Sequence, residues 1–121
     1  MHIDFSPEQR AFQDELRRYF ADLVTPDVID EIRKDREGGG PLYHETLRRM
    51  GRDGYLGIGW PVEYGGRGAG VFEQIVWSEE YARAWAPDLI MLAVGTSLVG
   101  PVLISKGKPW QRERFLEKIL R

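Results

Sequence analysis

The chain has 121 residues, of which 42% are hydrophobic and 30% charged, and it contains no cysteine. These proportions are typical of one globular domain and exclude a disordered chain, and the lack of cysteine excludes disulfides, thiolate nucleophiles and cysteine metal ligands. The formal net charge of −2 excludes a basic field for nucleic acid or an anionic membrane. We expect no membrane span, because the most apolar stretch, 89–104, is shorter than the roughly 20 residues needed and holds glycine, serine and proline.

The first half of the chain carries three helix starts. Ser6 can cap a helix that begins at Pro7, with Gln9 completing a capping box, and this helix is predicted to run to about residue 24. Pro26 and Pro41 begin two more helices, which Gly38–Gly40 and then Gly51 or Gly54 are expected to end. Apolar residues recur at helical spacing in all three: Phe12, Leu16, Tyr19, Phe20 and Leu23; Val28, Ile29 and Ile32; Tyr43, Leu47 and Met50.

The stretch GWPVEYGGRGAG, residues 59–70, sets the stiff pair Trp60–Pro61 against several glycines. One interpretation is a loop that cradles a phosphate, which would require a preceding strand and a βαβ unit. The other is a sharp irregular turn anchored by Trp60 and Tyr64. Because no strand precedes the glycines, the sequence favours the turn.

The second half is predicted to hold a helix over 71–84, an apolar helix from Asp88 to Gly107 that Pro101 kinks or interrupts, and a last helix from Pro109. The residues predicted to face inward are Phe72, Ile75, Val76, Tyr81, Ala82, Trp110, Phe115, Leu116, Ile119 and Leu120. No stretch alternates as a strand does, so we predict an all-α domain over 1–121 with about six helices. The last helical pattern is still running at Arg121, and we therefore expect this domain to be part of a longer protein.

No catalytic or metal-binding group is visible in the sequence. His2 and His44 lack partners at metal-ligand spacing, and Glu79 and Glu80 are interpreted as surface charges of a helix. The apolar segment 90–104 leaves two interpretations open. Its small residues serve close helix packing, or they line an apolar ligand cavity.

Three blocks of the chain, in this order, carry a resemblance to one family: DFSPEQRAFQDELRRYF, LRRMGRDGYLGIGWPVEYGGRG and GTSLVGPVLISKGKPWQRERFLEKIL. Together they resemble the N-terminal helical domain of the flavin-dependent acyl-CoA dehydrogenases, most of all actinobacterial members. The resemblance covers essentially the whole chain. It implies a bundle-like helical domain without the β domain and the C-terminal helical domain that follow in the family.

The resemblance implies an oxidoreductase that oxidises an acyl-CoA thioester at Cα–Cβ to the enoyl-CoA, with hydride transfer to FAD. It places the catalytic glutamate and most FAD contacts in the missing regions, so we expect no catalytic residue in this chain and an inactive fragment. It also places the apolar helix at the acyl end of the substrate pocket. The predicted substrate-binding residues are Met91, Leu92, Val94, Gly95, Leu98 and Val99.

The resemblance further implies a cytoplasmic homo- or hetero-oligomer in fatty acid or sterol degradation, with an acceptor of the electron-transfer flavoprotein type. A second hypothesis stays open, namely a stand-alone helical module that binds proteins and has lost catalysis. A downstream β domain with flavin-binding motifs would decide between the two.

Overall fold

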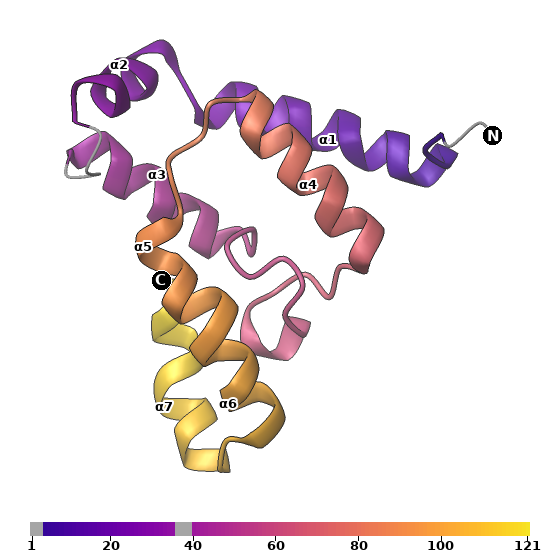
Figure 1. The fold of residues 1–121 in the computed structure, drawn as a ribbon, viewed down its shortest axis with the longest axis vertical. Helices are drawn as coiled ribbons and strands as arrows, with labels where there is room; N and C mark the ends of the chain where they lie inside the picture. Colours follow the sequence, from indigo (N-terminus) through magenta and orange to yellow (C-terminus); the bar gives the residue numbers. More distant parts are fainter. Residues whose placement is uncertain (1–3, 36–39) are drawn as a thin grey trace.

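The computed structural model describes residues 4–35 and 40–121, which fold as helices joined by connections, the longest of which spans residues 53–70 (Figure 1). The helices are α1 (Pro7–Leu23), α2 (Pro26–Lys34), α3 (Pro41–Arg52), α4 (Val71–Arg83), α5 (Ile90–Ala93), α6 (Gly100–Lys106) and α7 (Pro109–Leu120), with a 3₁₀ turn η1 (Val62–Tyr64) and a π-helical segment η2 (Val94–Val99). Since α5, η2 and α6 follow one another without a break, the described residues form six helices and no strand. This confirms the predicted all-α domain.

The helix starts lie where the sequence places them. The Gln9 amide donates to Ser6 Oγ at 3.2 Å, and the Ser6 amide donates to Gln9 Oε1 at 2.8 Å, which forms the predicted capping box. Prolines occupy the first position of α2, α3 and α7, where a missing N–H costs nothing. The helix α2 already ends at Lys34, and Gly38 and Gly39, which were expected to end it, lie outside the described residues.

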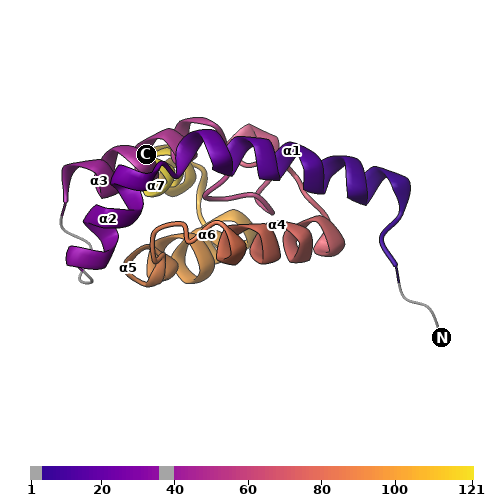
Figure 2. The same ribbon diagram turned by 90° about the horizontal axis from the view of Figure 1, so that it is seen from above.

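The helices form two layers. Figure 2 shows α1, α3 and α7 in one layer and α4 with the continuous helix α5–η2–α6 in the other. The main core lies between α1, α2, α3 and α4, and its buried members are Leu16, Phe20, Leu23, Val24, Val28, Met50, Tyr55, Ile58 and Val76. A second core cluster joins Trp60 of the glycine-rich loop to Leu116 and Leu120 of α7.

A buried carboxylate ties α1 to α4. Glu80 is only 2% exposed, so the interpretation of this residue as a surface charge is wrong. Its carboxylate accepts from Gln13 Nε2 at 2.8 Å and from Arg17 Nε at 3.1 Å. These partners supply the hydrogen bonds that a buried charge requires, which gives Glu80 a structural role in helix packing.

Five side chains predicted to face inward are instead exposed: Phe72, Ile75 and Ala82 on α4, and Trp110 and Phe115 on α7. The remaining apolar positions of α7 are confirmed, since Leu116 and Leu120 are buried and Ile119 is half-buried. The apolar surface of both helices is thus wider than the core that this chain offers to cover it.

The turn after α4 places a large residue in an unfavourable backbone conformation. Trp85 has φ 55°, in the left-handed region, and its side chain is 69% exposed. Its amide donates to Ala82 O and the Ala86 amide donates to Tyr81 O, as in the helix ending that usually carries glycine at this position. Neither the backbone nor burial therefore favours tryptophan here.

Trp85→Gly is expected to stabilise the chain by about 1 kcal/mol, because glycine adopts the left-handed conformation without the steric penalty. The gain is partly offset by the greater freedom of glycine in the unfolded chain. Chemical unfolding of both proteins measures the difference. Gly54 ends α3 with φ 81°, so Gly54→Ala is the matched control and should destabilise the chain. A loss of stability in Trp85→Gly would contradict the prediction.

Candidate functional site

The continuous helix α5–η2–α6 exposes a stripe of apolar side chains. Ile90, Val94, Leu98 and Val102 recur every four residues and are between 59% and 70% exposed, with Val99 beside them at 43%. Each of these side chains would be more stable out of water, by roughly 1.5–3 kcal/mol when fully buried. We refer to these five residues as the apolar stripe, and we take it as the candidate functional surface.

The six predicted substrate-binding residues share this helix but differ in their surroundings. Val94, Leu98 and Val99 belong to the apolar stripe, whereas Leu92 is half-buried and the side chain of Met91 lies outside the described part of the structure. A Cβ atom added at Gly95 would lie 3.0 Å from Ile119 Cγ2 of α7. Glycine here therefore allows the close packing of α7, whatever else it does. The role of the six residues in substrate binding stays a prediction.

The helix changes its hydrogen-bonding pattern in the middle of the stripe. The Gly100 amide donates to Gly95 O, five residues back, as in a π-helix. In that pattern Thr96 O would accept from residue 101, but Pro101 has no N–H. The helix continues through Pro101 to Lys106, so the expected disturbance at Pro101 takes the form of the π-helical segment η2.

The glycine-rich loop supplies the missing donor. Trp60 Nε1 donates to Thr96 O at 3.0 Å, across 36 positions of sequence. The indole ring lies directly against Gly100, where an added Cβ would be only 1.9 Å from Trp60 Cζ2. The GWP segment and the Gly100–Pro101 pair therefore fit each other.

A cleft of about 420 Å³ lies between α4, the glycine-rich loop and the continuous helix. Its lining includes two indoles, Trp60 and Trp77, together with Thr96, Ser97 and Pro101. Trp77 Nε1 is buried and has no hydrogen-bond partner among the described residues, in contrast to Trp60 Nε1.

The backbone of the glycine-rich loop bonds to itself. The amides of residues 64–69 all donate to carbonyl groups of Ile58, Trp60, Pro61 and Val62. A phosphate site needs backbone N–H groups that point at the ligand, and these six are already used. The structure thus supports the interpretation of the stretch as a turn anchored by buried Trp60, and the amides of this loop do not fit the pyrophosphate of a flavin.

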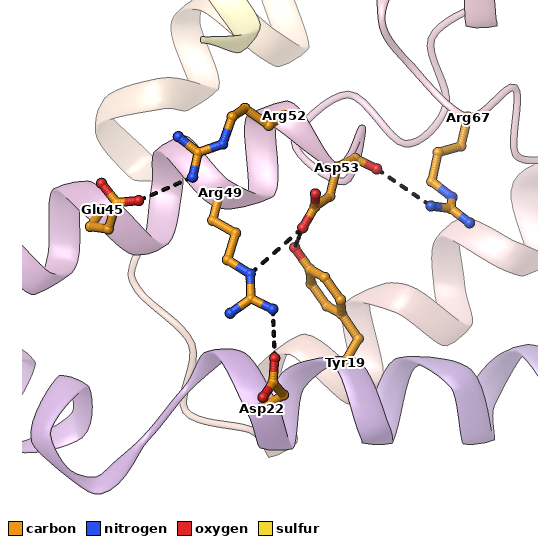
Figure 3. Close-up of polar contacts among 7 residues, drawn as sticks. All are labelled: Tyr19, Asp22, Glu45, Arg49, Arg52, Asp53 and Arg67. Carbon is orange, nitrogen blue, oxygen red and sulfur yellow. Dashed lines mark hydrogen bonds and ion pairs between the residues drawn. The ribbon is translucent and has the colours of Figure 1, made fainter.

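Charged residues between α1, α3 and the loop also have structural partners (Figure 3). Tyr19 Oη donates to Asp53 Oδ2 at 2.8 Å, and Arg49 bridges Asp22 and Asp53. Arg67 of the loop donates to Asp53 O at 3.4 Å, which connects the loop to the end of α3. Among the described residues no group of three or more histidine, aspartate or glutamate side chains could hold a metal ion. His44 is exposed, and His2 lies outside the described residues.

Burial raises the pKa of four tyrosines: Tyr19, Tyr43, Tyr55 and Tyr81. The pKa of Tyr55 rises to about 12 through burial and its hydrogen bond to Glu15, and those of Tyr19 and Tyr81 rise in the same direction, mainly through burial. The unfolded chain would ionise these groups near pH 10.

The chain should therefore lose stability as the pH rises from about 10 towards 12, because only the unfolded state releases the tyrosine protons there. Below pH 10 the stabilisation by these groups is complete. Melting midpoints between pH 8 and 11.5 measure this loss, and the Tyr55→Phe protein should show a shallower slope. An equal slope in both proteins would contradict the assignment to Tyr55.

Residues 6–121 match the family model described as "Acyl-CoA dehydrogenase, N-terminal domain". The chain is 48% identical over 120 residues to acyl-CoA dehydrogenase FadE29 of Mycobacterium tuberculosis and 38% identical over 121 residues to FadE26 of the same organism. These matches cover 99% and 98% of this chain and 30% of each relative.

Solved structures give the same result. A chain of the ChsE4–ChsE5 complex from Mycobacterium tuberculosis superposes with a TM-score of 0.78 at 37% identity, over 99% of this chain and 29% of that one. The Tcur3481–Tcur3483 steroid ACAD matches with the same TM-score and identity, over 99% of this chain and 30% of its own. Among the residues that the structure describes, no helix is both long and apolar enough to span a membrane. The chain belongs to the acyl-CoA dehydrogenase family and forms the N-terminal domain of that fold.

Proposed function

We propose that this chain is the N-terminal part of a flavin-dependent acyl-CoA dehydrogenase that converts an acyl-CoA thioester to the enoyl-CoA by oxidation at Cα–Cβ, with FAD as hydride acceptor. Membership of the family supports the reaction class. The chain spans about 30% of the length of its relatives, so the remaining domains would supply the catalytic glutamate and most of the flavin contacts. The buried carboxylate of Glu80 is held by Gln13 and Arg17 and has no part in this proposal as a base.

The apolar stripe is the observation that carries the proposal. A helix that packs on α7 and on Trp60 still exposes Ile90, Val94, Leu98 and Val102. In the complete protein an acyl group of the substrate would cover part of this surface, since apolar walls with few polar groups are typical of such pockets. Among the predicted residues whose side chains are described, Val94, Leu98 and Val99 are exposed, and this exposure supports the proposed contact.

The relatives support a bulky acyl group and a mixed assembly. Two of the solved relatives are complexes of two different proteins, and one of these is described as a steroid ACAD. By this analogy we propose a cytoplasmic hetero-oligomer that takes sterol-derived acyl-CoA esters and passes electrons to an acceptor of the electron-transfer flavoprotein type.

Leu98→Phe in the full-length protein tests the proposal. The side chain is 63% exposed in this domain, so the larger ring should leave the domain folded and fill space in the pocket. We expect kcat/KM for bulky acyl-CoA esters to fall roughly tenfold or more, with short esters and flavin content little changed. Val62→Phe, on the exposed η1 turn, is the matched control. Equal losses for both esters would contradict a pocket at Leu98.

The alternative is a stand-alone helical module whose apolar stripe binds another protein. The reading frame downstream of Arg121 separates the two functions. A β domain with flavin-binding motifs supports the enzyme, and a stop codon directly after Arg121 in the natural gene supports the module.

A further inference from the structure

The apolar stripe depends on an irregular stretch of helix. Val94, Leu98 and Val99 all lie in the π-helical segment η2, which ends immediately before Gly100 and Pro101. A π-helical segment holds one more residue in its turn than an α-helix would, so it sets the rotation of the preceding residues relative to the following ones. Whatever stabilises η2 therefore also decides which side chains form the stripe.

One carbonyl group in this segment needs a partner from outside the helix. The Gly100 amide is already bonded to Gly95 O, and residue 101 is a proline, so neither can donate to Thr96 O. A part-buried carbonyl without a partner destabilises the fold, because it has lost contact with water and gained no donor in return. Trp60 Nε1 removes this destabilisation with a hydrogen bond of 3.0 Å.

The indole is held firmly enough to act as a fixed donor. Trp60 is 6% exposed and packs with Leu116 and Leu120 of α7. Its amide donates to Gly57 O at 2.8 Å and its carbonyl accepts from the Gly68 amide at 2.8 Å, so the loop fixes its backbone. Gly100 then gives the ring its place against the helix, because any Cβ there would overlap the ring.

We propose that Trp60 is a positioning residue for substrate selectivity, which acts through its hydrogen bond to Thr96 O to keep η2 in the π-helical form that presents Val94, Leu98 and Val99. The inference rests on the proposed function for its effect on substrate. The hydrogen bond from Trp60 to Thr96 O, which replaces the donor that Pro101 lacks, is observed in this chain and does not depend on the proposed function.

The test uses three variants of the full-length protein. Trp60→Phe keeps an aromatic ring but removes the N–H donor. Pro101→Ala restores a backbone N–H at the position from which a π-helix would bond Thr96 O. The double variant carries both changes. Trp77→Phe is the matched control, because its indole lines the same cleft and its N–H has no hydrogen-bond partner among the described residues of this domain.

We expect Trp60→Phe to raise KM for a bulky acyl-CoA ester roughly tenfold, as the loss of one part-buried hydrogen bond implies, with a smaller effect on short esters and on kcat. Pro101→Ala in the Trp60→Phe background should restore most of the KM and of the melting midpoint. Trp77→Phe should leave KM unchanged, and any fall in its melting midpoint measures the loss of ring contacts alone, because Trp77 packs against the main core and stacks on Tyr81. All variants are compared at equal flavin content.

Equal KM shifts in Trp60→Phe and Trp77→Phe, or no recovery in the double variant, would overturn the proposal. If the wild-type protein oxidises no acyl-CoA ester, the proposed function fails, but the melting midpoints still test the link. Recovery of the midpoint by Pro101→Ala would then support the Trp60–Thr96 bond, and its absence would refute it.

Discussion

Phe20→Ala should lower the free energy of unfolding by about 3–5 kcal/mol, the usual cost of removing a buried ring and leaving a cavity. Phe20 is 2% exposed at the centre of the main core. Its ring meets Tyr19 and Tyr81 edge-on, each with centroids 5.5 Å apart, so neighbours on α1 and α4 both lose contacts. Since a small domain is stable by only about 5–15 kcal/mol, this single change removes a large part of the total.

Phe115→Ala is the matched control on α7. The sequence predicts that this ring faces inward, but it is 40% exposed in the structure and lies outside both core clusters. Its removal should therefore cost clearly less than the removal of Phe20. Chemical unfolding with a common slope compares the two. Equal losses of unfolding free energy in the two variants would contradict the expectation that the buried ring stabilises the fold more than the exposed one.

The helices could be predicted because their signals are local. Ser6, Pro7 and Gln9 act within one turn of each other, and Pro26, Pro41 and Pro109 fix the first residue of their own helices. These residues need no knowledge of the rest of the fold, and the structure confirms each start.

The direction of apolar side chains was harder to predict, because periodicity records which residues share a face but not what covers it. On α7 the apolar residues spread over more than one face, and this chain covers only the side with Leu116 and Leu120. On the continuous helix nearly every side is apolar, and the sequence alone left packing and ligand binding open. The structure separates Gly95, which meets Ile119, from the exposed Val94 and Leu98.

The contact of Trp60 with Thr96 could not be predicted by spacing, since 36 residues separate the two. A partial signal was present. Pro101 inside an apolar helix must leave a carbonyl without its usual donor, and a stiff Trp–Pro pair in a glycine-rich loop is a candidate to supply one. Only the fold shows that the indole N–H of the loop lies next to the carbonyl group that lacks a donor.

The same loop gives the second large effect. Gly66→Ala would place a Cβ 2.2 Å from Trp60 O and 2.4 Å from Gly57 O. Both carbonyls are fixed, because Trp60 O accepts from the Gly68 amide and Gly57 O accepts from the Trp60 amide. Relief of the overlap must therefore break hydrogen bonds in the loop, and we expect a loss of about 3 kcal/mol, near the upper end for overpacking.

Gly59→Ala is the control within the same loop, because the three atoms nearest to its Cβ would all belong to the amide end of the flexible Gln74 side chain. It should cost less than about 1 kcal/mol, since an exposed side chain can move aside. Chemical unfolding of both variants measures the difference.

A strained loop would also move Trp60 away from Thr96 O. Gly66→Ala in the full-length protein should therefore reproduce the selective KM rise expected of Trp60→Phe, whereas Gly59→Ala should not. Comparable losses in the two glycine variants would mean that the loop yields at Gly66, and that its backbone does not fix the position of Trp60.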